Sequence, residues 1–210
     1  MSDGRAVLVL GIGNVLWADE GFGVRAVEAL HAAYVFPAAV SVIDGGTLGL
    51  YLFELIASAR RIVLFDAIDF GLAPGTLRVF RDRDVPSWSA VKMSPHQTGF
   101  NDVLALAALR GQAPEKITLI GVQPQELEDL GGSLTDAVKA RIPEAVEIAA
   151  LELERWGYAG ERRAGGEPVP SLNTAALAVD RYERDRPSDA EACRIGDPRV
   201  LASAVSTEER

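Results

Sequence analysis

Residues 7–23, VLVLGIGNVLWADEGFG, decide the fold that this sequence predicts. The stretch opens with an apolar run and ends it in the tight turn Gly11-Ile12-Gly13-Asn14. An apolar run without polar alternation is typical of a strand buried on both faces, such as a central strand of a parallel sheet. After the turn, Val24, Val27 and Leu30 recur about one helical turn apart and predict a helix. We therefore expect a central strand that leads directly into a helix.

Apolar runs and helical periodicity continue along the chain in alternation. The predicted elements, in chain order, are strand 38–43, helix 50–59, strand 62–65, a short antiparallel or edge strand 77–80, helix 98–110, strand 116–122 and helix 134–156. Pro143 should kink the last helix or divide it in two, because proline removes a backbone donor. Strands that alternate with helices predict an α/β fold with a largely parallel sheet.

Composition excludes several classes of protein. The chain has 210 residues, 48% of them hydrophobic, which suits one well-buried domain. A net charge of −9 argues against nucleic acid or an anionic membrane surface as the main partner. No signal-peptide pattern opens the sequence, and no apolar run approaches the length of a membrane span. The single cysteine, Cys193, forms no internal disulfide, so a cytoplasmic location is expected.

The composition changes after Gly157. Residues 158–210 are rich in Gly, Pro, Arg and Glu, with one further apolar cluster over 172–179. Such a segment cannot bury enough apolar surface to form a packed core. We therefore predict a single domain over 1–157 and a polar C-terminal extension over 158–210 that is largely disordered.

Acidic residues gather where the predicted strands end. Glu20 follows the first strand, Asp44 the second and Asp66 the third. The carboxyl ends of parallel strands meet at one edge, where open α/β sheets bind ligands. A long loop predicted over 81–97 adds His96, one of the two histidines of the chain.

Glu20, Asp66 and His96 are therefore candidate ligands of one divalent ion. Two carboxylates and one imidazole suit a cation such as Zn²⁺ or Ni²⁺ and leave open positions for water or substrate. Simpler interpretations stay open, because Glu20 can stabilise a helix N-terminus, Asp66 can cap a turn and His96 can be an ordinary loop residue. The second histidine, His31, is expected to be structural.

Nucleotide binding is a further alternative. Gly11-Ile12-Gly13 begins like a dinucleotide-binding turn, and Asp44 lies where a ribose would need an acid. Leu16, however, stands where the third glycine belongs. Asp19 and Glu20 at the helix entry would also repel a pyrophosphate. Neither an HExxH helix nor a GxSxG elbow is present in the sequence.

Five motifs occur together in the order typical of one family. They are GIGNVLWADEGFGVR, DGGTLGLYL, LFDAIDFGLAPGT, SPHQTGF and LIGVQPQ. In this respect the sequence, over about residues 7–156, resembles the maturation endopeptidases of nickel-iron hydrogenases, and most closely their uptake-hydrogenase branch. The resemblance implies a three-layer α/β/α sandwich around a mostly parallel sheet.

The resemblance also implies a function and a set of residues. It implies removal of a short C-terminal peptide from the hydrogenase large-subunit precursor, after a basic residue, with Ni²⁺ carried by the precursor as the recognised feature. Zn²⁺ or a similar ion would substitute in the isolated protein. Glu20, Asp66 and His96 match the metal-binding positions of the family, and Asp44 matches an acid implicated in recognition or processing, which makes it the candidate catalytic acid. A non-catalytic nickel-insertion checkpoint for the same precursor is the alternative.

Overall fold

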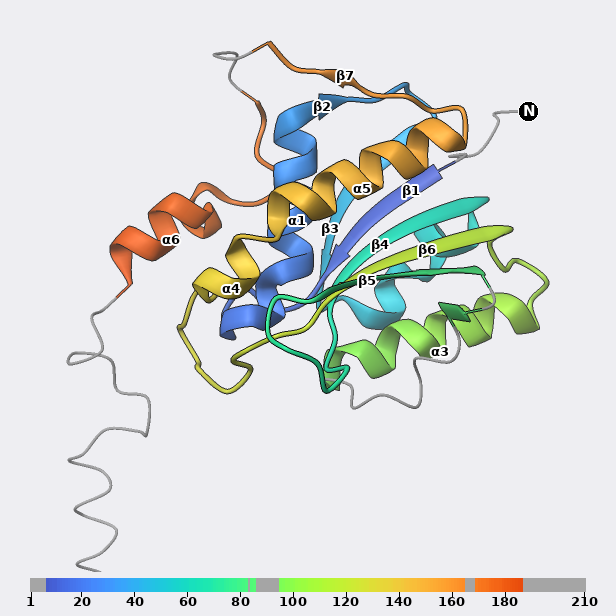
Figure 1. Cartoon of the computed structure of the whole chain (residues 1–210). Coiled ribbons are helices and arrows are strands. Elements are labelled where there is room, and N and C mark those ends of the chain that lie inside the picture. Colours follow the sequence, from blue (N-terminus) through green and yellow to red (C-terminus); the bar gives the residue numbers. More distant parts are fainter. Residues whose placement is uncertain (1–6, 83, 86–94, 165–168, 187–210) are drawn as a thin grey trace, which may run out of the picture.

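The computed structural model of the chain describes residues 7–82, 84–85, 95–164 and 169–186, and Figure 1 shows their arrangement. The strands are β1 (Val7–Ile12), β2 (Tyr34–Val35), β3 (Val40–Gly46), β4 (Arg61–Ala67), β5 (Leu77–Arg81), β6 (Lys116–Val122) and β7 (Glu161–Arg162). The α-helices are α1 (Phe22–Ala33), α2 (Phe53–Ala57), α3 (Pro95–Leu109), α4 (Asp136–Lys139), α5 (Ile142–Arg155) and α6 (Val179–Asp185). Short 3-10 turns are η1 (Ala18–Gly21), η2 (Gly49–Leu52) and η4 (Ala175–Leu177).

The main sheet is five-stranded, in the order β3-β1-β4-β6-β5. Its first four members are parallel, and β5 runs antiparallel to β6 at the edge. Helices α1 and α5 cover one face, whereas α2 and α3 cover the other (Figure 1). The predicted three-layer α/β/α fold with a mostly parallel sheet is confirmed.

The unbroken apolar run of β1 is explained by the two covered faces of the sheet. Val7 and Val9 pack in the core beneath α1 and α5, and Leu8 and Leu10 pack in the core beneath α2 and α3. Successive side chains of a strand point to opposite faces, so a strand with a core on each side needs apolar residues at every position. This double burial fits the position of β1 as an interior strand between β3 and β4.

One helix boundary confirms the sequence-based expectation and another differs from it. The helix predicted over 134–156 is divided into α4 and α5, with Pro143 in the first turn of α5, as proline chemistry predicts. Helix α3 begins at Pro95, so His96 lies in a helical first turn, and its prediction as a loop residue is wrong. Proline fits the first helical position because it needs no intrahelical donor there. Residues 83 and 86–94 of the predicted loop lie outside the described residues.

The C-terminal extension differs from the predicted disorder over the part that is described. β7 pairs with β2, and residues 169–186 run along α1 to α6, which lies beside α4 (Figure 1). Glu183 of α6 accepts hydrogen bonds from Lys139 and from Ser133. Hydrogen bonding to the core, rather than an apolar core of its own, thus orders this segment. The rest of the extension, including Cys193, lies outside the described residues, and the domain boundary at 157 stays a prediction.

No helix in the described ranges is both long and apolar enough to cross a bilayer.

A buried carboxylate joins α5 to the edge of the sheet. Glu152 is 4% exposed and accepts hydrogen bonds from Arg81 of β5 and Thr118 of β6. Burial acts to raise the pKa of Glu152, but the hydrogen bond and charge of Arg81, with Thr118 and Arg155, outweigh it and hold the pKa below its usual value. The ionised form is therefore favoured in the folded state.

Glu152→Gln should lower the free energy of unfolding at pH 7 by about 1–3 kcal/mol, the range for hydrogen bonds to a charged group. Because the folded-state pKa is depressed, this stabilisation exists above the unfolded-state pKa and disappears as the pH falls through the folded-state value. Urea unfolding at pH 7 and pH 3 checks both points. Glu154→Gln, an exposed change on the same helix, is the control. Equal effects of the two variants at pH 7 would contradict the assignment.

Candidate active site

Glycines bring the start of α1 against the ends of two strands. A Cβ on Gly13, whose φ is +133°, would lie 1.8 Å from the carbonyl oxygen of Glu20. A Cβ on Gly23 would lie 2.1 Å from the carbonyl oxygen of Ile12 in β1 and 2.3 Å from that of Phe65 in β4. No side chain fits at these separations, so glycine alone permits the approach. The result is that η1 and the first turn of α1 lie directly on the carboxyl edge of β1 and β4.

Asp19 acts as a structural clamp at this edge. Its Oδ2 atom accepts hydrogen bonds from the backbone N–H groups of Gln125 (2.8 Å) and Glu126 (3.0 Å) and from the hydroxyl of Thr135 (3.0 Å). Its Oδ1 atom accepts the backbone N–H of Thr135 at 2.7 Å. Four bonds use most of the acceptor capacity of a carboxylate. Asp19 therefore holds the segment after β6 onto η1 and has a structural role.

The residue before the clamp carries backbone strain. Ala18 is buried and has a φ of +41°, in the left-handed region that costs a residue with a Cβ about 1–2 kcal/mol. The hydrogen bonds of Asp19 on its C-terminal side offset that cost. Strain of this kind is retained where surrounding contacts fix the backbone, often at functional sites. Here the strained residue opens η1, the turn that also contains Asp19 and Glu20.

Glu20 and Asp66 are the two buried carboxylates of the predicted ligand set. Glu20 is 9% exposed and Asp66 is 2% exposed. Asp66 is the penultimate residue of β4, and η1 contacts that strand. The fold thus brings both residues to the same edge of the sheet, as the sequence predicts. Buried carboxylates are costly unless a cation or hydrogen-bond donors compensate them, which makes the pair suited to a divalent ion.

His96 reaches the same region through its backbone position. It lies in the first turn of α3, and α3 contacts η2, which follows the carboxyl end of β3. The side chain of His96 is not among those described. Within the described part of the chain, no three His, Cys, Asp or Glu side chains converge as a metal site. The ligand set Glu20, Asp66 and His96 therefore stays a prediction.

Asp44 lies near the carboxyl end of β3, on the other side of β1 from Asp66. It pairs in register with Gly11, which also pairs with Phe65, so Asp44 and Asp66 are about two strand spacings, roughly 10 Å, apart along the edge. Its Oδ1 atom accepts the backbone N–H of Gly46 at 2.8 Å, and its Oδ2 atom accepts the amide of Asn173.

The environment of Asp44 raises the pKa of its carboxyl group above the usual value. Burial is the main cause and raises the pKa of the carboxyl group, and the nearby charge of Glu28 adds to it. The hydrogen bonds from Gly46 and Asn173 and the charge of Arg25 act in the opposite direction without cancelling the shift. An acid whose pKa is raised by burial, at a ligand-binding edge, is a candidate functional group.

A pocket of about 220 Å³ opens beside Asp44. Its walls come from the turn after β1, the start of α1, the end of β3 and the C-terminal extension; they are Gly13, Asn14, Val15, Leu16, Val24, Asp44, Gly46, Thr47, Asn173 and Leu177. Neither Glu20 nor Asp66 is among these lining residues, although residues 13–16 connect the pocket to η1 in the chain. The site therefore has two neighbouring parts, one with the buried carboxylate pair and one with Asp44.

Sequence reasoning missed three polar residues that shape this edge. Arg25 is 5% exposed, although it stands next to the apolar stripe of α1, and an Arg inside the GFGVR motif was the available signal. Gln123 accepts hydrogen bonds from the N–H groups of Phe70 and Leu72, and so fixes the loop after β4. Asn173 gave no signal, because it lies in a segment predicted to be disordered.

Comparison with known proteins places the chain among similar sequences and folds. A family model described as "Hydrogenase maturation protease" matches residues 24–152. The hydrogenase expression/formation protein HoxM of Cupriavidus necator is 53% identical over 93% of this chain and 98% of its own. HupD of Rhodobacter capsulatus is 55% identical over 95% of this chain and 94% of its own.

A solved structure, the hydrogenase maturating endopeptidase HybD from Escherichia coli, has a TM-score of 0.72 and 42% identity. The match covers 98% of that chain but 75% of this one. The remaining quarter corresponds in length to the segment after residue 157. The match with HoxM, in contrast, covers 93% of this chain and therefore includes part of the extension.

Gly13→Ala should lower the free energy of unfolding by about 3 kcal/mol or more, because the new methyl group adds a backbone clash to the strain of a positive φ. Gly49→Ala is a matched control. Gly49 has a φ of +50°, but a Cβ there meets no atom within 4 Å, so only about 1–2 kcal/mol of strain is expected. Denaturant unfolding of both variants checks the difference. Equal losses would mean that the approach of η1 to β1 is looser than described.

Proposed function

Because the chain belongs to the hydrogenase maturation protease family, we propose that it removes a short C-terminal peptide from the large-subunit precursor of a nickel-iron hydrogenase and requires nickel in that precursor. The family makes the chain a peptidase. The observation that carries the proposal is the buried pair Glu20 and Asp66 at the carboxyl edge of a sheet whose fold matches an endopeptidase over nearly all of that protein.

The proposed site binds the nickel of the substrate rather than a resident ion. Glu20, Asp66 and His96 would supply two carboxylates and one imidazole, and none of the three is a cysteine. Carboxylates favour harder cations, so such a set should hold free nickel only modestly. A precursor that carries nickel on its own thiolates would complete the coordination sphere. Shared coordination would then distinguish a metal-loaded precursor from an empty one.

Positioning is the main physical contribution of this arrangement. When the precursor docks through its nickel, the scissile peptide bond is held beside the carboxyl edge of the sheet. Fixing a reacting bond beside its nucleophile is worth about 7–11 kcal/mol of barrier in favourable cases. Hydrolysis then requires water to attack the carbonyl carbon, the C–N bond to break and a proton to reach the leaving amine. Asp44, held at the same edge, is the proposed supporting acid.

Cleavage should depend on nickel in the precursor. Purified full-length protein incubated with nickel-loaded precursor should release a short C-terminal peptide, and the metal-free precursor should stay at full length. Mass spectrometry of both reactions checks this. Rapid cleavage of the metal-free precursor would contradict nickel dependence. Binding of loaded precursor without any cleavage would instead support a non-catalytic checkpoint role.

Glu20→Gln should leave nickel-loaded precursor uncleaved, because the amide keeps the shape of the side chain but loses its charge.

His96→Ala should weaken binding of free Ni²⁺ or Zn²⁺. Loss of even an indirect supporting contact costs roughly 10–100-fold in affinity, so loss of a ligand should cost at least as much. Calorimetric titration measures the affinity, and a thermal melt verifies that each variant folds. Glu54→Gln, an exposed change in α2, is the control. Wild-type cleavage by Glu20→Gln, or unchanged affinity of His96→Ala, would remove that residue from the site.

A further inference from the structure

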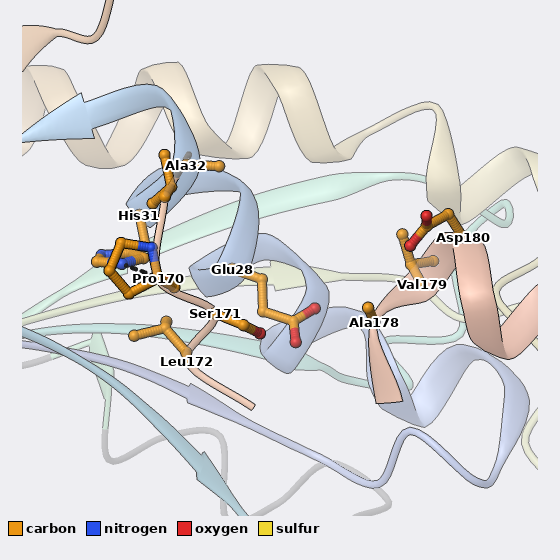
Figure 2. A pocket seen from close by; sticks show the side chains of 10 residues that line it. Glu28, His31, Ala32, Pro170, Ser171, Leu172, Ala178, Val179 and Asp180 are labelled. Atoms are coloured by element: carbon orange, nitrogen blue, oxygen red, sulfur yellow. Dashed lines mark hydrogen bonds between the residues drawn. The ribbon is translucent and has the colours of Figure 1, made fainter. Parts of the chain in front are cut away.

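The C-terminal extension crosses α1 and returns to the carboxyl edge of the sheet. Figure 2 shows Pro170, Ser171 and Leu172 beside the C-terminal half of α1, where His31 Nε2 lies 3.0 Å from the carbonyl oxygen of Pro170. These residues line a pocket of about 230 Å³ on α1, and the extension lines the same pocket again at Ala178, Val179 and Asp180, with Glu28 between the two contacts (Figure 2). Residues 173–177 lie between these contact points in the chain. Two of them, Asn173 and Leu177, line the Asp44 pocket.

One amide group joins the extension to two carboxylates. Asn173 Nδ2 donates to Glu28 Oε1 at 3.0 Å and also donates to Asp44 Oδ2. Asn173 therefore separates two acidic groups that would otherwise repel each other. Asp44 keeps acceptor capacity, because its two observed side-chain bonds leave further lone pairs on both oxygens. The amide thus orients the carboxylate without blocking it.

A buried arginine holds the extension in this position. Arg25 Nη1 donates to Glu28 Oε2 at 2.9 Å and to the carbonyl oxygen of Leu177 at 2.6 Å. Its guanidinium also lies 5.9 Å from the ring centroid of Tyr182. A guanidinium that is 5% exposed needs such partners, because an uncompensated buried charge is costly. The extension supplies the carbonyl and the ring, so the core is built to receive it.

The Asp44 pocket combines apolar walls with one charged group. Val15, Leu16, Val24 and Leu177 supply the apolar surface, and Asp44 supplies the carboxylate. Leu16 is 43% exposed, which leaves apolar surface open to a ligand. Side chains of Lys and Arg match this combination, since each has an apolar stem and a cationic end. Among these four apolar residues, Leu177 is the one that belongs to the C-terminal extension.

We propose that the C-terminal extension completes a subsite for a basic side chain of the precursor, with Asn173 as the positioning residue of Asp44 and Leu177 as one wall. The proposal rests on the proposed peptidase function and goes beyond it by assigning a role in specificity to the extension.

Asn173 also tunes the charge of the subsite. Its hydrogen bond lowers the pKa of Asp44, against the opposing effect of burial and of Glu28. Arg25 is the other charged group that acts on Asp44, and it too lowers the pKa. Removal of the amide should therefore raise the pKa of Asp44. A basic side chain binds the ionised form of Asp44. In Asn173→Ala, the acidic limb of the pH profile of kcat/KM should therefore move to higher pH.

The test compares full-length variants on two nickel-loaded precursors, one with Arg before the cleaved bond and one with Gln there. For the Arg precursor, Asn173→Ala should raise KM about tenfold, the change expected from loss of one hydrogen bond to a charged group, with a smaller effect on kcat. For the Gln precursor, KM should change little. Asn173→Gln, which keeps an amide donor, should restore part of the affinity. Glu183→Gln is the matched control, because it weakens the extension at Lys139, away from Asp44.

The possible results separate the proposal from the function on which it rests. A KM increase confined to the Arg precursor and to Asn173→Ala, with a shifted acidic limb, supports the subsite. Equal losses in Asn173→Ala and Glu183→Gln, or equal losses on both precursors, would reduce the extension to a structural support and overturn it. Wild-type kinetics in Asn173→Ala would overturn it as well. A wild-type protein that cleaves neither loaded precursor would overturn the peptidase function itself, and the subsite with it.

Discussion

The close approach of η1 and α1 to the ends of β1 and β4 is the constraint on which the site depends. It exists because Gly13 and Gly23 have no Cβ. An added Cβ would lie 1.8 to 2.3 Å from the carbonyl oxygens that these glycines face. The position of Glu20 is a consequence of this contact, because Glu20 lies in η1, which packs against the strand ends. Asp66 lies on the strand side of the same contact. The apolar run of β1 provides the fixed base, because it is buried in two cores at once.

Polar side chains at this edge divide by how fully their hydrogen-bonding capacity is used. Asp19 accepts four bonds from the segment after β6, which use most of its acceptor capacity. Gln123 likewise uses both ends of its amide on the loop around Asp69 and Phe70. Both side chains thereby fix the backbone around the predicted site. Of the two adjacent acids, Asp19 is structural, whereas Glu20 is the predicted metal ligand.

The extension adds a second layer of control around Asp44. Arg25, Glu28 and Asn173 form a chain of hydrogen bonds from the buried face of α1 to the carboxylate. The two ends of the described extension are held independently, at His31 by Pro170 and at Lys139 by Glu183. The conformation of the residues between these two points can therefore be set by their contacts at the Asp44 pocket rather than by packing among themselves. A polar segment with little apolar surface gains order in this way from charged partners on the core.

The sequence by itself determined the order of strands and helices along the chain and the placement of the acids Glu20, Asp44 and Asp66 at the carboxyl edge of the sheet. These follow from local rules, since apolar periodicity and turn chemistry act within a few residues. Tertiary structure alone decided that Asp19 is a clamp, that Arg25 is buried, that His96 belongs to a helix and that Asn173 meets Asp44. The bonds of Asp19, Arg25 and Asn173 join residues 106, 152 and 129 positions apart, respectively. No local pattern records a partner so distant, because the pairing exists only once the sheet has brought both segments to one edge.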